Sequence, residues 1–297
     1  MNRSTAPSPD DLEVSIIGPG RGECVLVHLG NNEWCVIDSC IARGRDEPVA
    51  VEYLNNLKNG ALSGVRLIVA THWHDDHIRG LASMLRQAPD ARFACSAALH
   101  TDNFLTLVEA AGSTIQGRSG VDEFASIFQL LVERAAGGKP KKLATPVFAI
   151  ESRRLLLHLV EGSRAFPATV TALSPSDGTV KLAFTDIAQL LPKAGEAQRR
   201  IINRAPNHTS VALWIEVGTR RALLGADLEH TGHPGEGWMA VLASHRDPKA
   251  ATLFKVPHHG SVNADCPEVW AKMLIEKPGC GSHAVYGWKE FAAAFRS

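Results

Sequence analysis

The chain has 297 residues, of which 45% are hydrophobic and 21% are charged, a composition typical of a globular protein with a sizeable core. Lysine plus arginine and aspartate plus glutamate number 31 each, so the formal net charge is zero. The overall charge therefore gives no reason to expect binding to nucleic acid. No stretch is long and apolar enough to span a membrane, and the opening MNRSTAPSPDD contains no apolar signal-peptide core. We therefore expect a cytoplasmic protein with a disordered tail over residues 1–11. None of the six cysteines forms a C-x-x-C pair, which favours buried free thiols over a zinc ribbon or a disulfide framework.

The first third of the chain predicts a β-meander followed by alternating helices and strands. Short β-rich runs separated by Gly-rich and Asn-rich turns cover residues 12–18, 23–30 and 33–39. The next expected elements are a helix over 47–57, a strand over 64–72, a helix over 75–87 and a strand over 91–96. The apolar run within 64–72 predicts a strand that is buried on both of its faces.

The rest of the chain alternates again between helical and β character. Residues 97–165 have helical spacing and a basic break, KPKK, and we interpret them as a helical insertion that serves as a lid or a substrate platform. The later expected elements are a strand over 167–175, a helix over 184–204 and strands over 208–218, 220–227 and 251–260. This order favours a single α/β domain over 12–297 with a four-layer αββα sandwich. Hairpin turns between the first strands make a doubly wound parallel sheet a poorer fit.

The segment ATHWHDDHIRG places His72, His74, Asp76 and His77 within six residues. Side chains two residues apart in an extended segment point the same way, so His72 and His74 are able to share one metal ion. Asp76 and His77 follow where the chain turns into a helix, and they point toward a second ion. Imidazole nitrogen and carboxylate oxygen suit zinc, manganese or iron. The alternative is a solvated polar loop with incidental histidines.

Three further strand ends carry residues of the same chemical type. Asp227 ends ALLGAD, His258 and His259 end LFKVPHH, and Asp38 ends CVID. A carboxylate such as Asp227 can bridge two metal ions, although capping of the following turn is the alternative. Asp38 is a candidate to hold a ligand imidazole from behind. Because ligand sites in α/β folds favour strand ends, the combination predicts a dinuclear metal site.

The pattern H-x-H-x-D-H resembles that of the metallo-β-lactamase superfamily. Within it, the chain is most similar to the branch of the hydrolase domain of ComEC, the bacterial DNA-uptake competence protein. The matching pieces are GPGRGECVLVHLGNNEWCVIDS, THWHDDHIRG, NHTSVALWIEVGTRRALLGAD and LFKVPHHGS, which cover residues 12–96 and 205–262 in the same order. The resemblance implies a hydrolase with two divalent metal ions, Zn²⁺ or Mn²⁺, in the αββα fold.

The resemblance also implies a role for each matching residue. The ligands of the first ion would be His72 and His74, those of the second would be Asp76, His77 and His258, and Asp227 would bridge the two. The catalytic groups would be Asp76 and His259, and the residues that support the site from behind would be Asp38 and Asn207. Many members add a third histidine to the first ion from a GHTPGS-like turn, where this chain has PNHTSVAL. His208 is therefore an additional candidate ligand, and a histidine at a strand edge is the alternative.

These features favour a phosphodiesterase or nuclease that cleaves DNA or another phosphodiester by means of a metal-bound hydroxide. Arg79 beside the cluster and Ser261 after the paired histidines are candidate substrate-binding residues. One alternative is a hydrolase of a small ester, thioester or lactone. Another is a non-catalytic metal-binding partner of a second protein in a bacterial defence system. No helix-turn-helix or zinc-finger pattern is present, so sequence-specific reading of DNA is not indicated.

Overall fold

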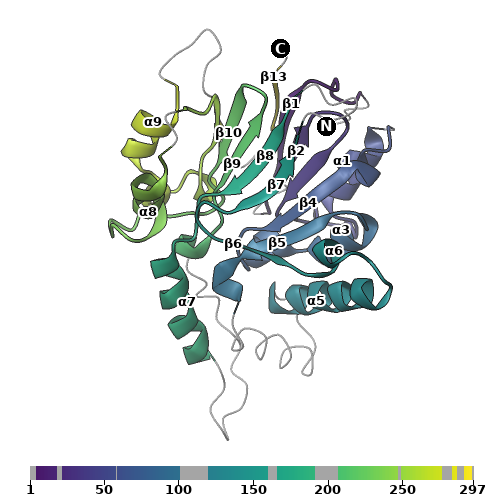
Figure 1. Ribbon diagram of the computed structural model, residues 1–297, viewed down its shortest axis with the longest axis horizontal. Coiled ribbons are helices and arrows are strands. Elements are labelled where there is room, and N and C mark those ends of the chain that lie inside the picture. Colours follow the sequence, from purple (N-terminus) through teal and green to yellow (C-terminus); the bar gives the residue numbers. More distant parts are fainter. Residues whose placement is uncertain are drawn as a thin grey trace, which may run out of the picture.

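The fold consists of two β-sheets packed face to face and covered by helices on their outer faces (Figure 1). The computed structural model describes residues 5–18, 22–57, 59–100, 120–159, 166–190, 207–246, 249–275, 283–285 and 291–295. One outer layer contains α1 (Val49–Asn56), α3 (Leu81–Gln87) and α5 (Gly120–Ala136), on the right in Figure 1. The other contains α8 (Gly237–Ser244) and α9 (Pro267–Met273), on the left. The predicted αββα sandwich is therefore confirmed.

The first sheet has the strand order β13–β1–β2–β3–β4–β5–β6. Its strands are β1 (Leu12–Ile17), β2 (Cys24–Leu29), β3 (Trp34–Ile37), β4 (Val65–Ala70), β5 (Arg92–Ser96), β6 (Val147–Ala149) and β13 (Phe291–Phe295). The strands β1, β2 and β3 form the expected antiparallel meander. From β3 to β6 the neighbouring strands are parallel, so their carboxyl ends lie at one edge of the sheet.

The second sheet has the strand order β12–β11–β10–β9–β8–β7. Its strands are β7 (Arg154–His158), β8 (Ala168–Ala172), β9 (Leu213–Val217), β10 (Arg220–Leu224), β11 (Leu253–Lys255) and β12 (His283–Val285). The strands from β7 to β10 are antiparallel, whereas β10, β11 and β12 are parallel. As in the first sheet, the carboxyl ends of the parallel strands share one edge.

The strand β4 shows how the sequence builds the four layers. Leu67 and Val69 pack between the two sheets, whereas Ile68 and Ala70 pack against the outer helices. All four side chains are 0% exposed. Alternate residues of a strand point to opposite faces, so a strand that is covered on both sides is apolar at successive positions. The prediction of a doubly buried strand is confirmed.

The prediction of a helical insertion over 97–165 is wrong for part of that range. The described helices are α5, α6 (Lys141–Ala144) and the short turn η2 (Ala97–Leu99), but 147–149 and 154–158 are β6 and β7, one strand in each sheet. Strands of three and five residues give too short an alternation to stand out beside helical sequence. The helix α5 belongs to the outer layer, because Arg134 donates hydrogen bonds to the backbone oxygens of Leu85 and Ala88 at the end of α3.

The single helix expected over 75–87 is two helices, α2 (Asp75–Ile78) and α3. They meet at Gly80, whose φ of +84° is a left-handed conformation that favours glycine. The expected disordered tail is hydrogen-bonded where it is described, because Asn31 N donates to Pro9 O over 2.7 Å. Residues 1–4, which complete that tail, lie outside the described residues.

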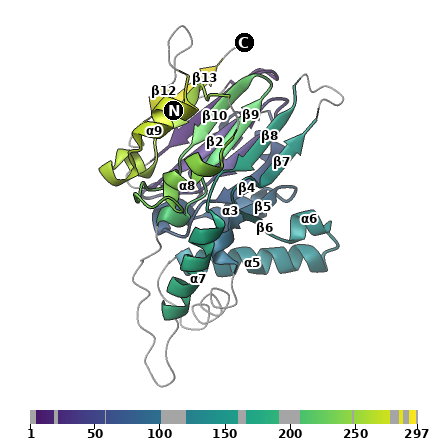
Figure 2. The ribbon, with the colours of Figure 1, turned by 60° about the vertical axis from the view of Figure 1, so that its left-hand side comes forward.

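The helix α7 (Asp177–Leu190) begins earlier than the expected 184–204, and residues 191–206 lie outside the described part. It projects beyond the sandwich in both ribbon views (Figures 1 and 2) and contacts η2 and the turn η3 (Asn207–Thr209). No helix in the described ranges has the length and apolar character needed to cross a membrane.

Candidate metal centre

The residues that the sequence singled out meet at one edge of the sandwich. Asp38 follows β3 and His72 follows β4, and these two strands are parallel neighbours. Asp227 follows β10, and the pair of His258 and His259 follows β11, which are parallel neighbours in the other sheet. Because the carboxyl ends of parallel neighbours lie side by side, four separate chain segments deliver their polar side chains to the same place.

Asp38 holds two of the histidines from behind. Its Oδ2 lies 2.8 Å from His77 Nδ1 and accepts a hydrogen bond from Thr71 Oγ1 over 2.7 Å, while its Oδ1 accepts from Thr71 N over 2.7 Å. Thr71 Oγ1 also lies 2.9 Å from His72 Nδ1. With both Nδ1 atoms engaged, the Nε2 atoms of His72 and His77 face the site. Asp38 thus contacts the ring of His77 directly and that of His72 through Thr71.

His72 and His74 bring two ring nitrogens together. His72 Nε2 lies 3.1 Å from His74 Nδ1. Asp227 Oδ2 lies 4.0 Å from His72 Nε2 and 3.3 Å from His77 Nε2. One carboxylate oxygen therefore lies near the rings of both His72 and His77.

Asp76, His77 and His259 form a second group, whose ligand atoms all lie within 4.8 Å of one another. His259 Nε2 is 3.9 Å from Asp76 Oδ2. This separation fits a shared ion, because two ligand atoms at bonds of about 2.1 Å lie at most ~4.2 Å apart. The resemblance implied His258 in this position, and the geometry differs, since His259 is the histidine that lies beside Asp76.

His258 has other neighbours. Its Nε2 lies 3.3 Å from Asn207 Nδ2, and its Nδ1 lies 3.6 Å from Glu229 Oε1. His258 has φ 46° and His259 has φ 51°, so both residues have a left-handed backbone, and their rings reach different partners. Strained backbone of this kind is found at functional sites. Asn207 therefore supports His258. His208 lies in the same turn as Asn207, and the ligand groups found in the described ranges do not include it.

Burial and neighbouring carboxylates set the charges of the site. Burial lowers the pKa of His72 well below its ordinary value, with a further contribution from His77, and burial also lowers the pKa of His74. Burial opposes charge on His77 as well, but Asp227 and Asp38 raise its pKa well above the ordinary value. For Asp227, burial acts to raise the pKa, and His77 and His72 hold it well below its usual range. Neutral His72 and His74 with an ionised Asp227 are the states that bind a metal.

Two buried carboxylate oxygens at the centre of the cluster, Glu23 Oε2 and Asp227 Oδ1, have no hydrogen-bond partner among the described residues. Beside them, His77 Nε2 lies 3.3 Å from Asp227 Oδ2. The ligand atoms of these three residues lie within 4.8 Å of one another. An unsatisfied buried polar group costs about 1–3 kcal/mol, and more when it is charged. One divalent cation held by Glu23, His77 and Asp227 would satisfy the unpaired oxygens, so the donor set fits a metal ion.

Two further residues of this site, Glu23 and Lys255, were not predicted from the sequence. Glu23 precedes β2, which is antiparallel to β3, so the beginning of β2 lies at the same edge as the end of β3. Lys255 Nζ lies 2.6 Å from Glu23 Oε1, and the Lys255 side chain is 1% exposed. The available signal was a lysine inside the apolar run of β11, because a lysine is buried only when it is paired.

A cavity of about 650 Å³ opens beside the second group. It is lined by Gly22, Cys40, Ile41, Ala42, Arg43, Gly44, Arg45, Asp46, Asp75, Asp76 and Arg79. The sequence predicted Arg79 as a substrate-binding residue but not Arg43 or Arg45. Ser261, the other predicted contact, is exposed in the turn after His259 and is not part of this lining.

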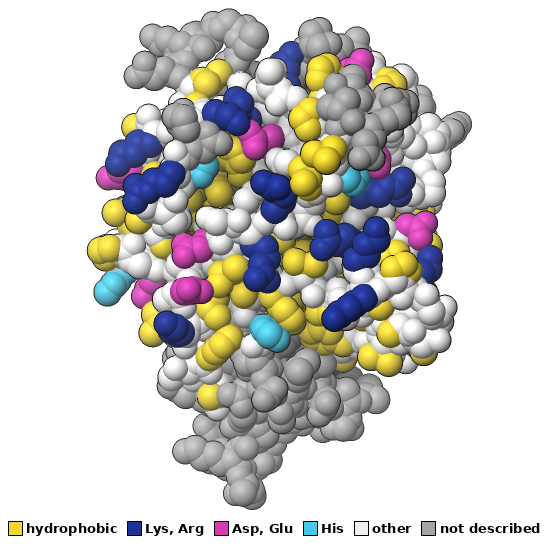
Figure 3. All heavy atoms as spheres, viewed as in Figure 1, with side chains coloured by type: hydrophobic (Ala, Val, Ile, Leu, Met, Phe, Trp, Pro, Cys, Tyr) yellow, Lys and Arg dark blue, Asp and Glu magenta, His cyan; other side chains and the backbone are white. Residues whose placement is uncertain are grey.

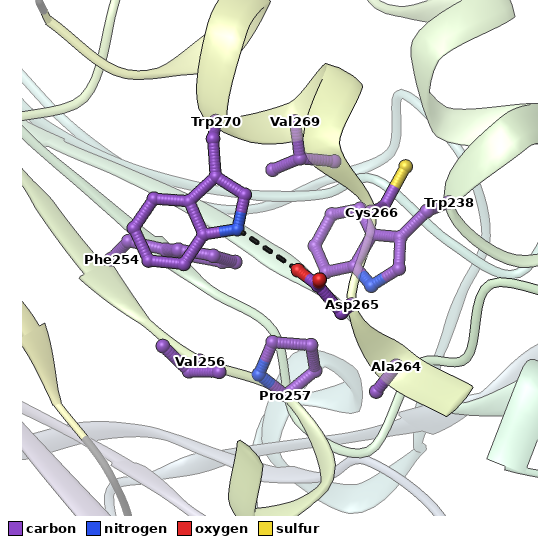
Figure 4. A pocket seen from close by; sticks show the side chains of 9 residues that line it. All are labelled: Trp238, Phe254, Val256, Pro257, Ala264, Asp265, Cys266, Val269 and Trp270. Carbon is purple, nitrogen blue, oxygen red and sulfur yellow. Dashed lines mark hydrogen bonds between the residues drawn. The ribbon is translucent and has the colours of Figure 1, made fainter. Parts of the chain in front are cut away.

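Two other parts of the surface give less support for a substrate site than this cavity does. A cavity of about 10 Å³ lies beside the segment that leads to His258, and there Trp270 Nε1 donates to Asp265 Oδ1 over 3.3 Å (Figure 4). It has room for one water molecule at most. On the face shown in Figure 3, lysine and arginine side chains are spread among acidic and apolar ones and are not gathered into one stripe.

Comparisons with known proteins address the fold and the family. A sequence model of the metallo-β-lactamase superfamily matches residues 17–265, and no curated protein matches the chain. One similar solved structure is a mutant of the CmlA β-hydroxylase, with 16% identity, a TM-score of 0.42 and coverage of 92% of this chain and 40% of that chain. Another is the metallo-β-lactamase fold protein YhfI from Bacillus subtilis, with 13% identity, a TM-score of 0.38 and coverage of 82% of this chain and 70% of that chain. A third is the Rm3 metallo-β-lactamase, with 14% identity, a TM-score of 0.36 and coverage of 85% of this chain and 78% of that chain.

The chain spans less than half the length of the CmlA protein, and these identities concern the fold alone. The family match does not distinguish the competence-protein branch, which stays a prediction. Because the superfamily model covers most of the sequence, including every candidate ligand, the chain belongs to the metallo-β-lactamase superfamily, whose members are metal-dependent hydrolases.

Proposed function

We propose that the protein is a dinuclear metal-dependent phosphodiesterase that hydrolyses DNA or another phosphodiester. The observation that carries this proposal is the cavity of about 650 Å³, whose lining contains Arg43, Arg45 and Arg79. Guanidinium groups bind phosphate oxygens in a bidentate manner and stay charged at any physiological pH. Asp46 and Asp75 offset part of this charge, and the remaining acidic lining residue is a candidate metal ligand.

The donor set supports two divalent ions, zinc or manganese. We assign His72 and His74 to the first ion, Asp76, His77 and His259 to the second, and Asp227 to both. When bound, the ions would supply a hydroxide nucleophile near neutral pH and offset charge on the phosphoryl group. The contribution of Asp38 and Thr71 is to keep the ligand rings fixed for that chemistry.

We further assign the two adjacent histidines the reverse of the roles that the resemblance implied. His259 Nε2 lies close enough to Asp76 to share an ion with it and would be engaged there. His258 is 27% exposed, and its Nε2 lies 3.3 Å from Asn207 Nδ2 at the edge of the site. A partly exposed imidazole at that edge is suited to exchange a proton with the leaving oxygen.

The test is hydrolysis of bis-p-nitrophenyl phosphate, linear DNA and closed circular DNA, each with Zn²⁺ and with Mn²⁺. We expect hydrolysis that His72→Ala abolishes and that Arg79→Ala and Arg45→Ala each lower in kcat/KM by about tenfold, the loss expected for one hydrogen bond to a charged group. Lys142→Ala, at an exposed position in α6, is the control for a lost surface charge. Full activity in the double arginine variant would exclude the cavity as the substrate site.

The bounded size of the cavity supports one alternative, a hydrolase of a small ester, thioester or lactone. Its volume of about 650 Å³ lies within the usual range of small-molecule sites. Cleavage of an aryl acetate or a lactone, without cleavage of any phosphodiester, would establish that alternative. A protein that binds two ions and hydrolyses neither class would act as a metal-binding partner of another protein.

A further inference from the structure

We propose that Glu23 is a further metal ligand, whose Oε2 faces the second ion together with His77 and Asp227 while Lys255 holds Oε1. The inference rests on the metal centre of the proposed function and is independent of the substrate. Glu23 lies outside the H-x-H-x-D-H cluster by about fifty residues of sequence and reaches it only through the fold.

The first observation is that Glu23 is buried with one oxygen unpaired. Its side chain is 3% exposed, and Oε2 has no hydrogen-bond partner in the described part of the chain. His259 Nδ1 lies 3.6 Å from that oxygen, which is longer than a hydrogen bond. A buried carboxylate oxygen without a donor or a cation carries a large desolvation cost.

The second observation is the set of atoms that surround this oxygen. The ligand atoms of Glu23, His77 and Asp227 lie within 4.8 Å of one another. Asp227 Oδ1 has no hydrogen-bond partner among the described residues either, and His77 Nε2 lies 3.3 Å from Asp227 Oδ2. These side chains come from the start of β2, from α2 and from the end of β10. The Lys255 ammonium group offsets one of these two buried negative charges, and a metal ion held beside His77 would offset the other.

The third observation is that the other oxygen of Glu23 is fixed. Lys255 Nζ lies 2.6 Å from Glu23 Oε1 and donates to Ala226 O over 2.9 Å, in the residue before Asp227. The backbone N of Glu23 donates to Asp76 O over 2.9 Å. The carboxylate is therefore tied to two segments that carry ligands, and Oε2 is the oxygen left to face the ion.

This placement has a consequence for the choice of metal. With Glu23, three carboxylates and two imidazoles would hold the second ion, from two groups that share His77, whereas His72 and His74 would dominate the first. Carboxylate oxygen suits manganese better than imidazole nitrogen does. The second position therefore favours Mn²⁺ more strongly than the first, and Glu23 is a source of that preference.

The experiment measures metal binding by the full chain without substrate. Binding of Mn²⁺ is followed by electron paramagnetic resonance of the free ion, and binding of Zn²⁺ by competition with a chromogenic chelator. Glu23→Gln should raise the Kd of the Mn²⁺ ion that Glu23 helps to hold by at least about tenfold, and that of the corresponding Zn²⁺ ion by a smaller factor. Glu13→Gln, which changes a fully buried glutamate of β1 outside the ligand groups, is the matched control and should leave both Kd values unchanged.

Unchanged Mn²⁺ binding in folded Glu23→Gln would overturn the inference. If that variant does not fold, Glu23→Asp decides, because it keeps the negative charge and withdraws the oxygens by one methylene. A ligand role predicts weaker Mn²⁺ binding in Glu23→Asp, and unchanged binding overturns it.

A role that acts only through His259 would also overturn the inference. In that case Glu23→Gln would cause no further loss in the His259→Ala background, whereas a direct ligand causes a second loss. The experiment measures metal binding and not hydrolysis, so the two proposals fail separately. Unchanged metal binding in Glu23→Gln would overturn only the ligand assignment, and absence of diester hydrolysis would overturn only the phosphodiesterase.

Discussion

The buried pair of Lys255 and Glu23 gives a sharp prediction about stability. The two side chains are 1% and 3% exposed, and their charged atoms lie 2.6 Å apart. Lys255→Met removes the ammonium group and leaves a carboxylate buried without its partner, which costs about 3–5 kcal/mol. The second acceptor of Lys255, Ala226 O, keeps the hydrogen bond from His258 N, so it adds nothing to that cost. Since domains are stable by about 5–15 kcal/mol, the loss is a large fraction of the whole.

The assay is urea unfolding of the metal-free protein in a chelator, followed by circular dichroism. The matched control is Lys249→Met, because Lys249 is 51% exposed and lies 3.4 Å from Glu216, and an exposed pair contributes below about 1 kcal/mol. Adding Glu23→Gln to Lys255→Met should restore part of the lost stability, because it removes the unpaired charge. The reasoning is refuted if Lys255→Met costs no more than Lys249→Met, or if the double variant is less stable than Lys255→Met alone.

Three further predictions follow from the same geometry. Asp38→Asn should weaken metal binding by roughly 10–100-fold in the chelator assay, because the carboxylate that holds a ligand ring from behind is lost, and unchanged binding would contradict this. Gly225→Ala should lower both stability and hydrolysis, since a Cβ there would lie 2.8 Å from Pro257 Cβ, whereas Gly235→Ala, with nothing within 4 Å, should change neither. Burial raises the pKa of Cys40 to about 12, so roughly one thiol in ten thousand is ionised at pH 8. Ellman's reagent should therefore label Cys40 of the folded protein far more slowly than in urea, and fast native labelling would argue against its burial.

The sequence by itself determined the features that depend on neighbouring residues. The apolar run of β4 predicted a doubly buried strand, because side chains alternate between the two faces of a strand. The spacing of His72, His74, Asp76 and His77 predicted one compact donor cluster, and turns rich in Gly and Asn predicted the first meander. Where a segment was short, as in β6, the same kind of signal was too weak.

Only the tertiary structure decided which distant residues join that cluster. His258 and His259 are neighbours at the end of one strand, and their left-handed backbone places the ring of His258 near Asn207 and that of His259 beside Asp76. Glu23 enters the site because an antiparallel strand returns its beginning to the edge where parallel strands end. Side-chain periodicity is a property of a few consecutive residues, whereas the meeting of strand ends depends on pairing across the whole chain, so the motif was predictable and its complete set of neighbours was not.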